Sequence, residues 1–210
     1  MNVNELAQTM GDACYVFLAL NLLWGLYCAI LVWRRLAQLR FRTEQAQDDF
    51  VEELRQDLAD ADYEGAIDRC AVDERALPQL VLLALQNRDL DHAELRQLVA
   101  ERLQRDVLAP MENRVSWIIT VIRNGPLLGL FGTVLGMMAA FGRIGMGEKV
   151  QPAQIADEIS VALICTAMGL GTAIPLGYVA SSLNNRIRDL QESLTPALVR
   201  FLKHFKLVAA

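Results

Sequence analysis

Residues 125–142 read GPLLGLFGTVLGMMAAFG, a stretch without a single charged side chain. Very small residues recur in it every three or four positions, which places them on one face of a helix. They are Gly125, Gly129, Gly132, Gly136 and Ala140, spaced 4, 3, 4 and 4 residues apart. In lipid, small side chains let two helix backbones approach closely. The stretch therefore predicts a membrane-spanning helix with one face suited to close helix contact.

Two further stretches lack charge, residues 14–33 and residues 159–185. The chain is 53% hydrophobic and 21% charged, and these two kinds of residue are segregated along it. A helix needs about 20 apolar residues to cross the hydrocarbon core of a membrane. We therefore predict an all-α membrane protein with three transmembrane helices, at 14–33, 114–142 and 158–185.

The distribution of basic residues predicts the orientation of these helices. Residues 1–13 contain no Lys or Arg, which argues against a cleaved signal peptide, whereas Arg34 and Arg35 directly follow the first span. Basic residues near the ends of spans stay in the cytoplasm. We therefore expect a multi-pass protein whose N-terminus at 1–13 and short loop at 143–157 lie outside the membrane. A helical region at 34–113 and a C-terminal tail at 186–210 are expected in the cytoplasm.

The region 34–113 shows leucines at helical spacing, with a turn expected at Asp89–Asp91 and a new helix from His92. Pro78 suits the first turn of another helix. The many charged residues form either a solvated helix face or a docking surface for a cytoplasmic partner, and both interpretations stay open.

The third span carries a second stripe of small residues. Its members are Ala162, Thr166, Gly169, Ala173 and Gly177, again spaced 4, 3, 4 and 4 residues apart. Such stripes indicate either close packing of two helices or the lining of a lumen narrow enough to hold another helix. Likewise, Thr133, Thr166 and Thr172 each either bond to the carbonyl one turn earlier or offer a hydroxyl to a proton path.

Other residues exclude several classes of protein. The cysteines (Cys14, Cys28, Cys70 and Cys165) contain no C-x-x-C pair, so we expect packing residues and no metal site or disulfide. A formal net charge of −5 argues against nucleic acid as a partner. No nucleophile, acid–base pair or nucleotide-binding loop is evident, so we expect neither an enzyme nor a bound cofactor. Pro126 and Pro175 are expected to bend their helices.

Two blocks of sequence resemble a known family. Residues 125–137 closely resemble the second-span signature of the ExbB and TolQ proteins, and Ala162–Leu170 with Ala173–Pro175 resembles their third span. The resemblance covers roughly residues 60–190, so the chain is identified as a member of the MotA/TolQ/ExbB proton channel family, on its ExbB/TolQ branch.

The resemblance implies a location in the bacterial inner membrane, so that the outer segments 1–13 and 143–157 would be periplasmic. It also implies a homo-oligomeric ring, a pentamer in the best-known cases. The ring surrounds the single membrane helices of a partner of ExbD, TolR or MotB type, whose aspartate is alternately protonated and deprotonated. Thr133 and Thr166 match the threonines that face this aspartate, and Pro126 and Pro175 match helix-bending prolines. The small residues expected to border the proton path are Gly129, Gly132, Gly136, Ala162, Gly169 and Ala173.

The chain departs from the family pattern at two places. ExbB and TolQ carry a glutamate five residues before the third-span threonine, where this chain has Val161. Glu158 either replaces that acid one turn earlier or is a solvated residue at a helix N-terminus, where negative charge is favoured. Arg123 and Asn124 stand where small apolar residues are usual. Arg123 either extends to the cytoplasmic interface or shapes an inner proton exit.

Three functions are compatible with this pattern. The chain is the ring subunit of a proton-driven motor that powers envelope transport or mechanical work, or a self-contained channel, or an oligomeric membrane scaffold. The first is favoured because no span has a central acid to carry protons, and no internal repeat suggests a transporter.

Overall fold

The computed structural model describes residues 3–41, 43–60, 62–145 and 151–209, and every regular element within them is a helix. The all-α prediction is therefore confirmed. The chain divides into two compact units, Met1–Ile30 with Arg114–Ser182 and Leu31–Asn113 with Leu183–Ala210. Each unit is described separately.

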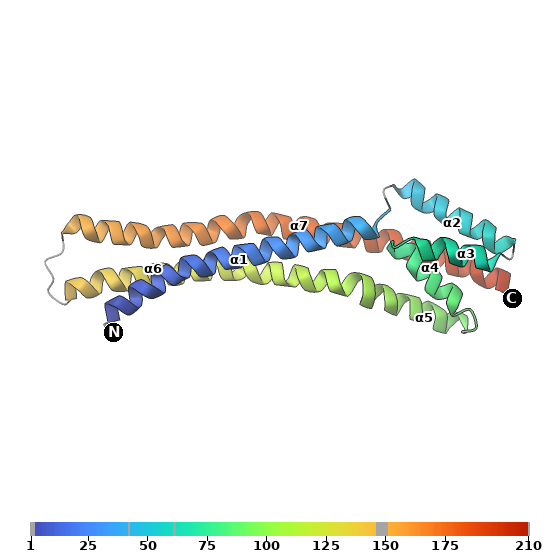
Figure 1. Cartoon of the computed structure of the whole chain (residues 1–210), viewed down its shortest axis with the longest axis horizontal. Coiled ribbons are helices and arrows are strands. Elements are labelled where there is room, and N and C mark those ends of the chain that lie inside the picture. The colour runs from blue at the N-terminus through green and yellow to red at the C-terminus, as the bar shows by residue number, and fades with distance from the viewer. Residues whose placement is uncertain (1–2, 42, 61, 146–150, 210) are drawn as a thin grey trace. The chain divides into compact units, whose positions relative to one another are not determined.

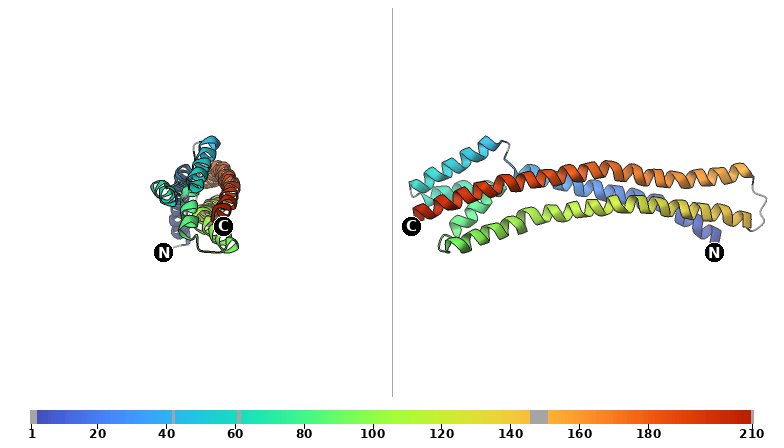
Figure 2. Two further views of the ribbon diagram at one scale, coloured as in Figure 1. Left: turned by 90° about the vertical axis from the view of Figure 1, so that its right-hand side faces the viewer. Right: turned by 180° about the vertical axis from the view of Figure 1, so that it is seen from behind.

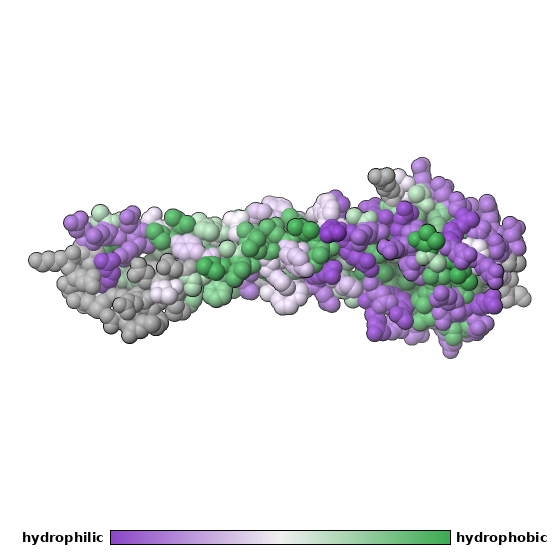
Figure 3. Space-filling view, viewed as in Figure 1, coloured by the Kyte–Doolittle hydropathy of each residue, from purple (hydrophilic) through white to green (hydrophobic). Residues whose placement is uncertain are grey.

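The first unit is built from three long helices that run alongside one another (Figures 1 and 2). These are α1 (Val3–Leu39), α6 (Ala109–Gly145) and α7 (Pro152–Ala209), each of which continues into the second unit. Three helical runs are long and apolar enough to cross a membrane: Ala13–Leu39, His92–Gly145 and Pro152–Phe205. Figure 3 shows hydrophobic side chains gathered over these helices. The prediction of three spans is confirmed by length and composition.

Polar and steric contacts attach α1 to both of the other helices. The side-chain amide of Asn21 donates to the Val121 carbonyl at 3.1 Å, and the Tyr15 hydroxyl donates to the Val161 carbonyl at 2.8 Å. A Cβ added to Gly25 would lie 2.9 Å from Val121 Cγ1 and 3.1 Å from Leu176 Cδ1. Gly25 therefore lets α1 approach α6 and α7 at the same level.

The second unit contains four short helices: α2 (Glu44–Ala59), α3 (Tyr63–Val72), α4 (Ala76–Gln86) and α5 (His92–Arg102). Side chains of Thr43, Asp62 and Asp91 accept hydrogen bonds from backbone N–H groups at the starts of α2, α3 and α5. The predicted helices, the turn before His92 and the place of Pro78 near a helix start are confirmed.

A six-residue π-helix, η1 (Leu103–Leu108), joins α5 to α6, so the helical run continues from His92 to Gly145. The predicted tail at 186–210 is likewise part of α7 as far as Ala209, with buried apolar residues at Ile187, Leu190 and Leu194. There the Gln47 side chain donates to the Ser193 carbonyl at 3.0 Å, which attaches α2 to α7.

The predicted segment boundaries at 33, 113 and 185 therefore fall inside helices. Charge marks where a chain leaves the hydrocarbon core, whereas a helix ends where capping groups or helix-breaking residues stop it. The connection between α6, which ends at Gly145, and α7, which begins at Pro152, lies inside the loop predicted at 143–157. Residues 146–150 of that loop lie outside the described residues.

Candidate functional site

The two stripes of small residues face each other where α6 packs on α7. A Cβ added to Gly129 would lie 2.7 Å from the Cys165 carbonyl oxygen and 2.9 Å from Thr166 Cα. One added to Gly169 would lie 2.5 Å from the carbonyl oxygen of Gly125. Neither position has room for a side chain, since the obstructing atoms belong to the backbone. The close-packing interpretation of the stripes is confirmed within a single chain.

The other small residues extend the same contact. A Cβ on Gly132 would lie 2.9 Å from Cys165 Sγ, and one on Gly136 would lie 2.6 Å from Ala162 Cβ. Ala173 is buried beside Gly125. A lumen bordered by these residues would form only in an assembly of several chains, so this second role of the small residues stays a prediction.

The three threonines of this contact differ in their hydrogen bonds. Thr133 is buried and its hydroxyl donates to the Leu130 carbonyl at 2.7 Å, while the Thr172 hydroxyl donates to the Gly169 carbonyl at 2.9 Å. Both hydroxyls therefore bond to a carbonyl of their own helix about one turn earlier, which is one of the two interpretations given above. The Thr166 hydroxyl oxygen is buried and finds no hydrogen-bond partner among the described residues. An unpaired buried polar group costs about 1–3 kcal/mol, so Thr166 is the hydroxyl of this contact that would gain most from a bond to another group.

A groove lies beside this contact, between α6 and α7. It has a volume of about 550 Å³ and is lined mainly by apolar side chains. The residues that line it are Ile122, Pro126, Leu170, Ala173, Ile174, Gly177, Tyr178 and Ser181. Both α6 and α7 remain helical through Pro126 and Pro175. Sequence reasoning missed the groove, although two of the predicted site residues, Pro126 and Ala173, line it.

An ion pair joins the other ends of α6 and α7. Arg143 donates to one oxygen of Glu158, while the other carboxylate oxygen is buried without a hydrogen-bond partner among the described residues. Of the two interpretations of Glu158, a solvated residue at a helix N-terminus does not fit, because α7 begins at Pro152 and Glu158 lies beyond its first turn. That Glu158 replaces the acid absent at Val161 stays a prediction. The sequence analysis missed its pairing with Arg143, although opposite charges flanking a short interhelical loop are a detectable signal. Val161 is exposed.

All four cysteines are free and buried, and Cys14 packs with Cys165 and Leu135. Among the described residues, no group of His, Cys, Asp and Glu could hold a metal ion. The burial of all four thiols agrees with the interpretation that they are packing residues.

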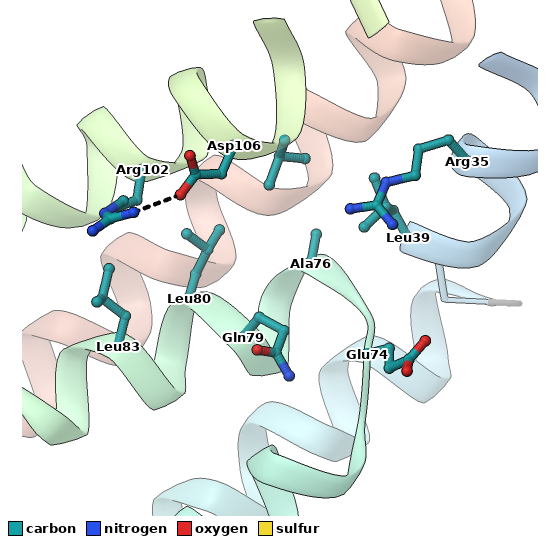
Figure 4. A pocket seen from close by; sticks show the side chains of 10 residues that line it. Arg35, Leu39, Glu74, Ala76, Gln79, Leu80, Leu83, Arg102 and Asp106 are labelled. Atoms are coloured by element: carbon teal, nitrogen blue, oxygen red, sulfur yellow. Dashed lines mark hydrogen bonds and ion pairs between the residues drawn. The ribbon is translucent and has the colours of Figure 1, made fainter. Parts of the chain in front are cut away.

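The second unit contains a pocket of about 310 Å³ that is lined by both polar and apolar side chains (Figure 4). Arg35 of α1, Arg102 of α5 and Leu80 of α4 are among its lining residues. Arg102 is paired with Asp106 of η1 at 2.9 Å, which neutralises one of the two cations. The pocket was not predicted, because its lining comes from three separate stretches of sequence.

Together these features define a multi-pass membrane protein whose spans cross at glycine contacts. Within the described part of the chain, the buried hydroxyl of Thr166 is left unpaired at this crossing. A family model described as the MotA/TolQ/ExbB proton channel family matches residues 72–195. Because this match covers more than half of the chain, the chain belongs to the MotA/TolQ/ExbB proton channel family.

Individual relatives support the assignment to this family. The Tol-Pal system protein TolQ of Haemophilus influenzae is 38% identical over 82 residues, which cover 39% of this chain and 36% of that protein. The biopolymer transport protein ExbB of Pseudomonas putida is 33% identical over 169 residues, 79% of this chain and 50% of that protein. ExbB of Salmonella typhimurium is 34% identical over 115 residues, 53% of this chain and 47% of that protein. The chain thus spans between about a third and a half of the length of these relatives.

Proposed function

We propose that this chain is the ring-forming subunit of a proton-driven motor in the bacterial inner membrane. Several copies would enclose a single-span partner of ExbD or TolR type, and an aspartate on that partner would carry the protons. The observation that carries the proposal is the buried, unpaired hydroxyl of Thr166 at the α6–α7 contact. It is a group that a proton-carrying side chain on another chain could use.

The absence of an acid in the spans supports a separate proton carrier. The stretches 14–33, 125–142 and 159–185 contain no Asp or Glu. A carboxylate at the centre of a membrane helix costs about 2.5–3.5 kcal/mol, and one charge crossing 100 mV releases about 2.3 kcal/mol. Since the two energies are similar, each proton could drive one step of a carboxylate between favourable and unfavourable positions around the ring.

The proposed path comprises Thr166 and Thr133, the small residues at the contact, and the groove beside Pro126. Rotation of Thr133 away from the Leu130 carbonyl would free its hydroxyl for the same carboxylate. The Arg143–Glu158 pair would stand at the periplasmic mouth, in place of the acid absent at Val161.

Co-purification with the product of the neighbouring gene, followed by native mass spectrometry, tests the proposal. The expected result is a ring of several copies that retains a smaller number of partner chains. A ring without a partner would instead favour the scaffold. A single chain that conducts protons in liposomes would establish the self-contained channel.

A further inference from the structure

Arg123 lies level with the middle of the uncharged runs of the two neighbouring helices, α1 and α7. The uncharged run of α1 extends from Cys14 to Trp33. Val121 of α6 contacts Asn21 and Gly25, which are central in that run. Arg123 follows Val121 by two residues, about 3 Å along the helix axis.

Contacts with α7 place Arg123 at the same level. On one side of it, Gly125 packs against Gly169, and on the other, Gly25 brings Val121 and Leu176 together. Arg123 is therefore level with the stretch between Gly169 and Leu176, the centre of the uncharged run 159–185. On α6 itself, nine residues, about 14 Å of helix, separate Arg123 from Arg114 at the cytoplasmic end of the predicted span. Extension of the side chain to the cytoplasmic interface does not fit this distance.

The face of α6 that bears Arg123 is uncovered, and it is polar on the side toward Arg114, whereas Leu127 and Leu130 farther along it are exposed and apolar. Arg123 is exposed, as are Ser116, Thr120 and Asn124, which follow one another at intervals of one helical turn. Val121 and Gly125, on the opposite side of α6, are buried. An arginine facing lipid at this depth costs at least about 2.5–3.5 kcal/mol. In the membrane this face is therefore covered by protein or water.

The counter-ion of Arg123 has to come from a different molecule. Among the described residues Arg123 makes no ion pair. The acids of the first unit all lie outside its uncharged runs: Glu5, Asp12, Glu148, Asp157 and Glu158. A second copy of this chain would bring another cation at the same level. Lipid phosphates lie at the membrane surface, about 15 Å away. The counter-ion that remains for Arg123 is a carboxylate on another membrane-embedded chain.

We infer that Arg123 forms an ion pair with a carboxylate on the membrane helix of the partner chain. The inference rests on the proposed function, since it takes that partner to be the enclosed single-span subunit. Thr133 lies ten residues farther along α6, about 15 Å toward the other end of the span. The carboxylate paired with Arg123 is therefore distinct from the one expected beside Thr133 and Thr166. The partner carries it about ten helical residues nearer the cytoplasm.

Variants of the co-purified complex test this pairing. Arg123→Gln should lower the fraction of rings that retain the partner, and the proton flux of the complex in liposomes, by at least about tenfold, since truncating one member of a buried charge pair costs 2 kcal/mol or more. Arg123→Lys should retain most of both. Arg114→Gln, at the start of the same span, is the matched control and should behave like the wild type.

A charge exchange makes the test independent of effects on folding. Arg123→Glu should release the partner, and replacing the partner's acid at this level by lysine should restore its retention. Failure of that rescue, wild-type behaviour of Arg123→Gln, or a partner helix without an acid at this level would overturn the inference while leaving the proposed function intact. Loss of the partner from the wild-type ring would overturn both.

Discussion

At the residue scale, Thr166 and Thr172 are a natural pair for comparison. Both lie on α7 and near the glycine contact, but only the Thr172 hydroxyl has a partner, the Gly169 carbonyl. Thr166→Val keeps the shape of the side chain and removes an unpaired polar group, so the free energy of unfolding should stay the same or rise by about 1 kcal/mol. Proton flux through the complex should fall at least about tenfold, because the proposed path would lose a hydroxyl that makes no hydrogen bond within the chain.

Thr172→Val is the control, and it should leave the flux close to that of the wild type. Thermal unfolding in detergent and flux in liposomes would be measured on the same preparations. If Thr166→Val destabilises the fold while its flux survives, Thr166 has a structural role and the proton path lies elsewhere.

Cys70 provides a second prediction, in the second unit. Burial, with a contribution from Asp73, raises the pKa of its thiol from the ordinary 9.0 to about 12. Because the folded state resists ionisation of this thiol, the resulting stabilisation is complete below pH 9 and is lost as the pH rises toward 12. At pH 8 the thiolate should be about a thousandfold scarcer than in the unfolded chain. Alkylation of the peptide containing Cys70, followed by mass spectrometry, should proceed only after unfolding, and rapid modification of the native protein would contradict the prediction.

Sequence reasoning identified the threonines but could not rank them. Spacing predicts which residues share a helix face, and it placed Thr133, Thr166 and Thr172 in the same region. Whether a hydroxyl bonds to its own helix depends on a side-chain rotation that spacing does not determine. The same limit applies to Glu158, whose environment depends on where α7 begins and on its pairing with Arg143.

At the scale of the elements, the contact of α6 with α7 depends on glycines. Gly129→Ala would place a Cβ 2.7 Å from the Cys165 carbonyl, so the two helices would have to separate. We expect the free energy of unfolding to fall by about 1–3 kcal/mol. Gly171→Ala is the matched control, because nothing lies within 4 Å of a Cβ at that position and alanine favours helix.

Thermal unfolding of the two variants in the same detergent would measure this difference. Gly171→Ala should unfold at or slightly above the wild-type temperature. Equal unfolding temperatures for both variants would show that the close approach of the helices does not contribute to stability.

The sequence predicted the elements better than their ends. Uncharged runs and small-residue stripes depend on short-range patterns, so three spans and their close contact could be predicted. The continuation of α7 through residue 185 and the π-helix at Leu103–Leu108 could not, because helices continue through charged stretches when tertiary packing favours them. The position of Arg123 relative to the neighbouring helices could not be predicted from the sequence. It follows from contacts between helices, such as those of Val121 with Asn21 and of Gly125 with Gly169.

At the scale of the whole molecule, the proposed motor requires one orientation in the membrane. The basic residues that follow the first and third spans predict the N-terminus outside and the C-terminus inside. That orientation places Glu158 at the periplasmic mouth, where protons enter, and Ser116 and Thr120 in the cytoplasmic half, below Arg123. A proton entering from outside would then reach the threonines before it reaches the level of Arg123.

Fusions to the C-terminus test this orientation. A fluorescent protein that folds only in the cytoplasm should be bright there, and a periplasmic alkaline phosphatase should be inactive. Moving the fusion to the N-terminus should reverse both results. Because protons move down their gradient toward the cytoplasm, the opposite orientation would place Glu158 at the exit. The order of sites proposed for the proton path would then be wrong, although the pairing of Arg123 with a partner carboxylate in the middle of the membrane would not depend on it.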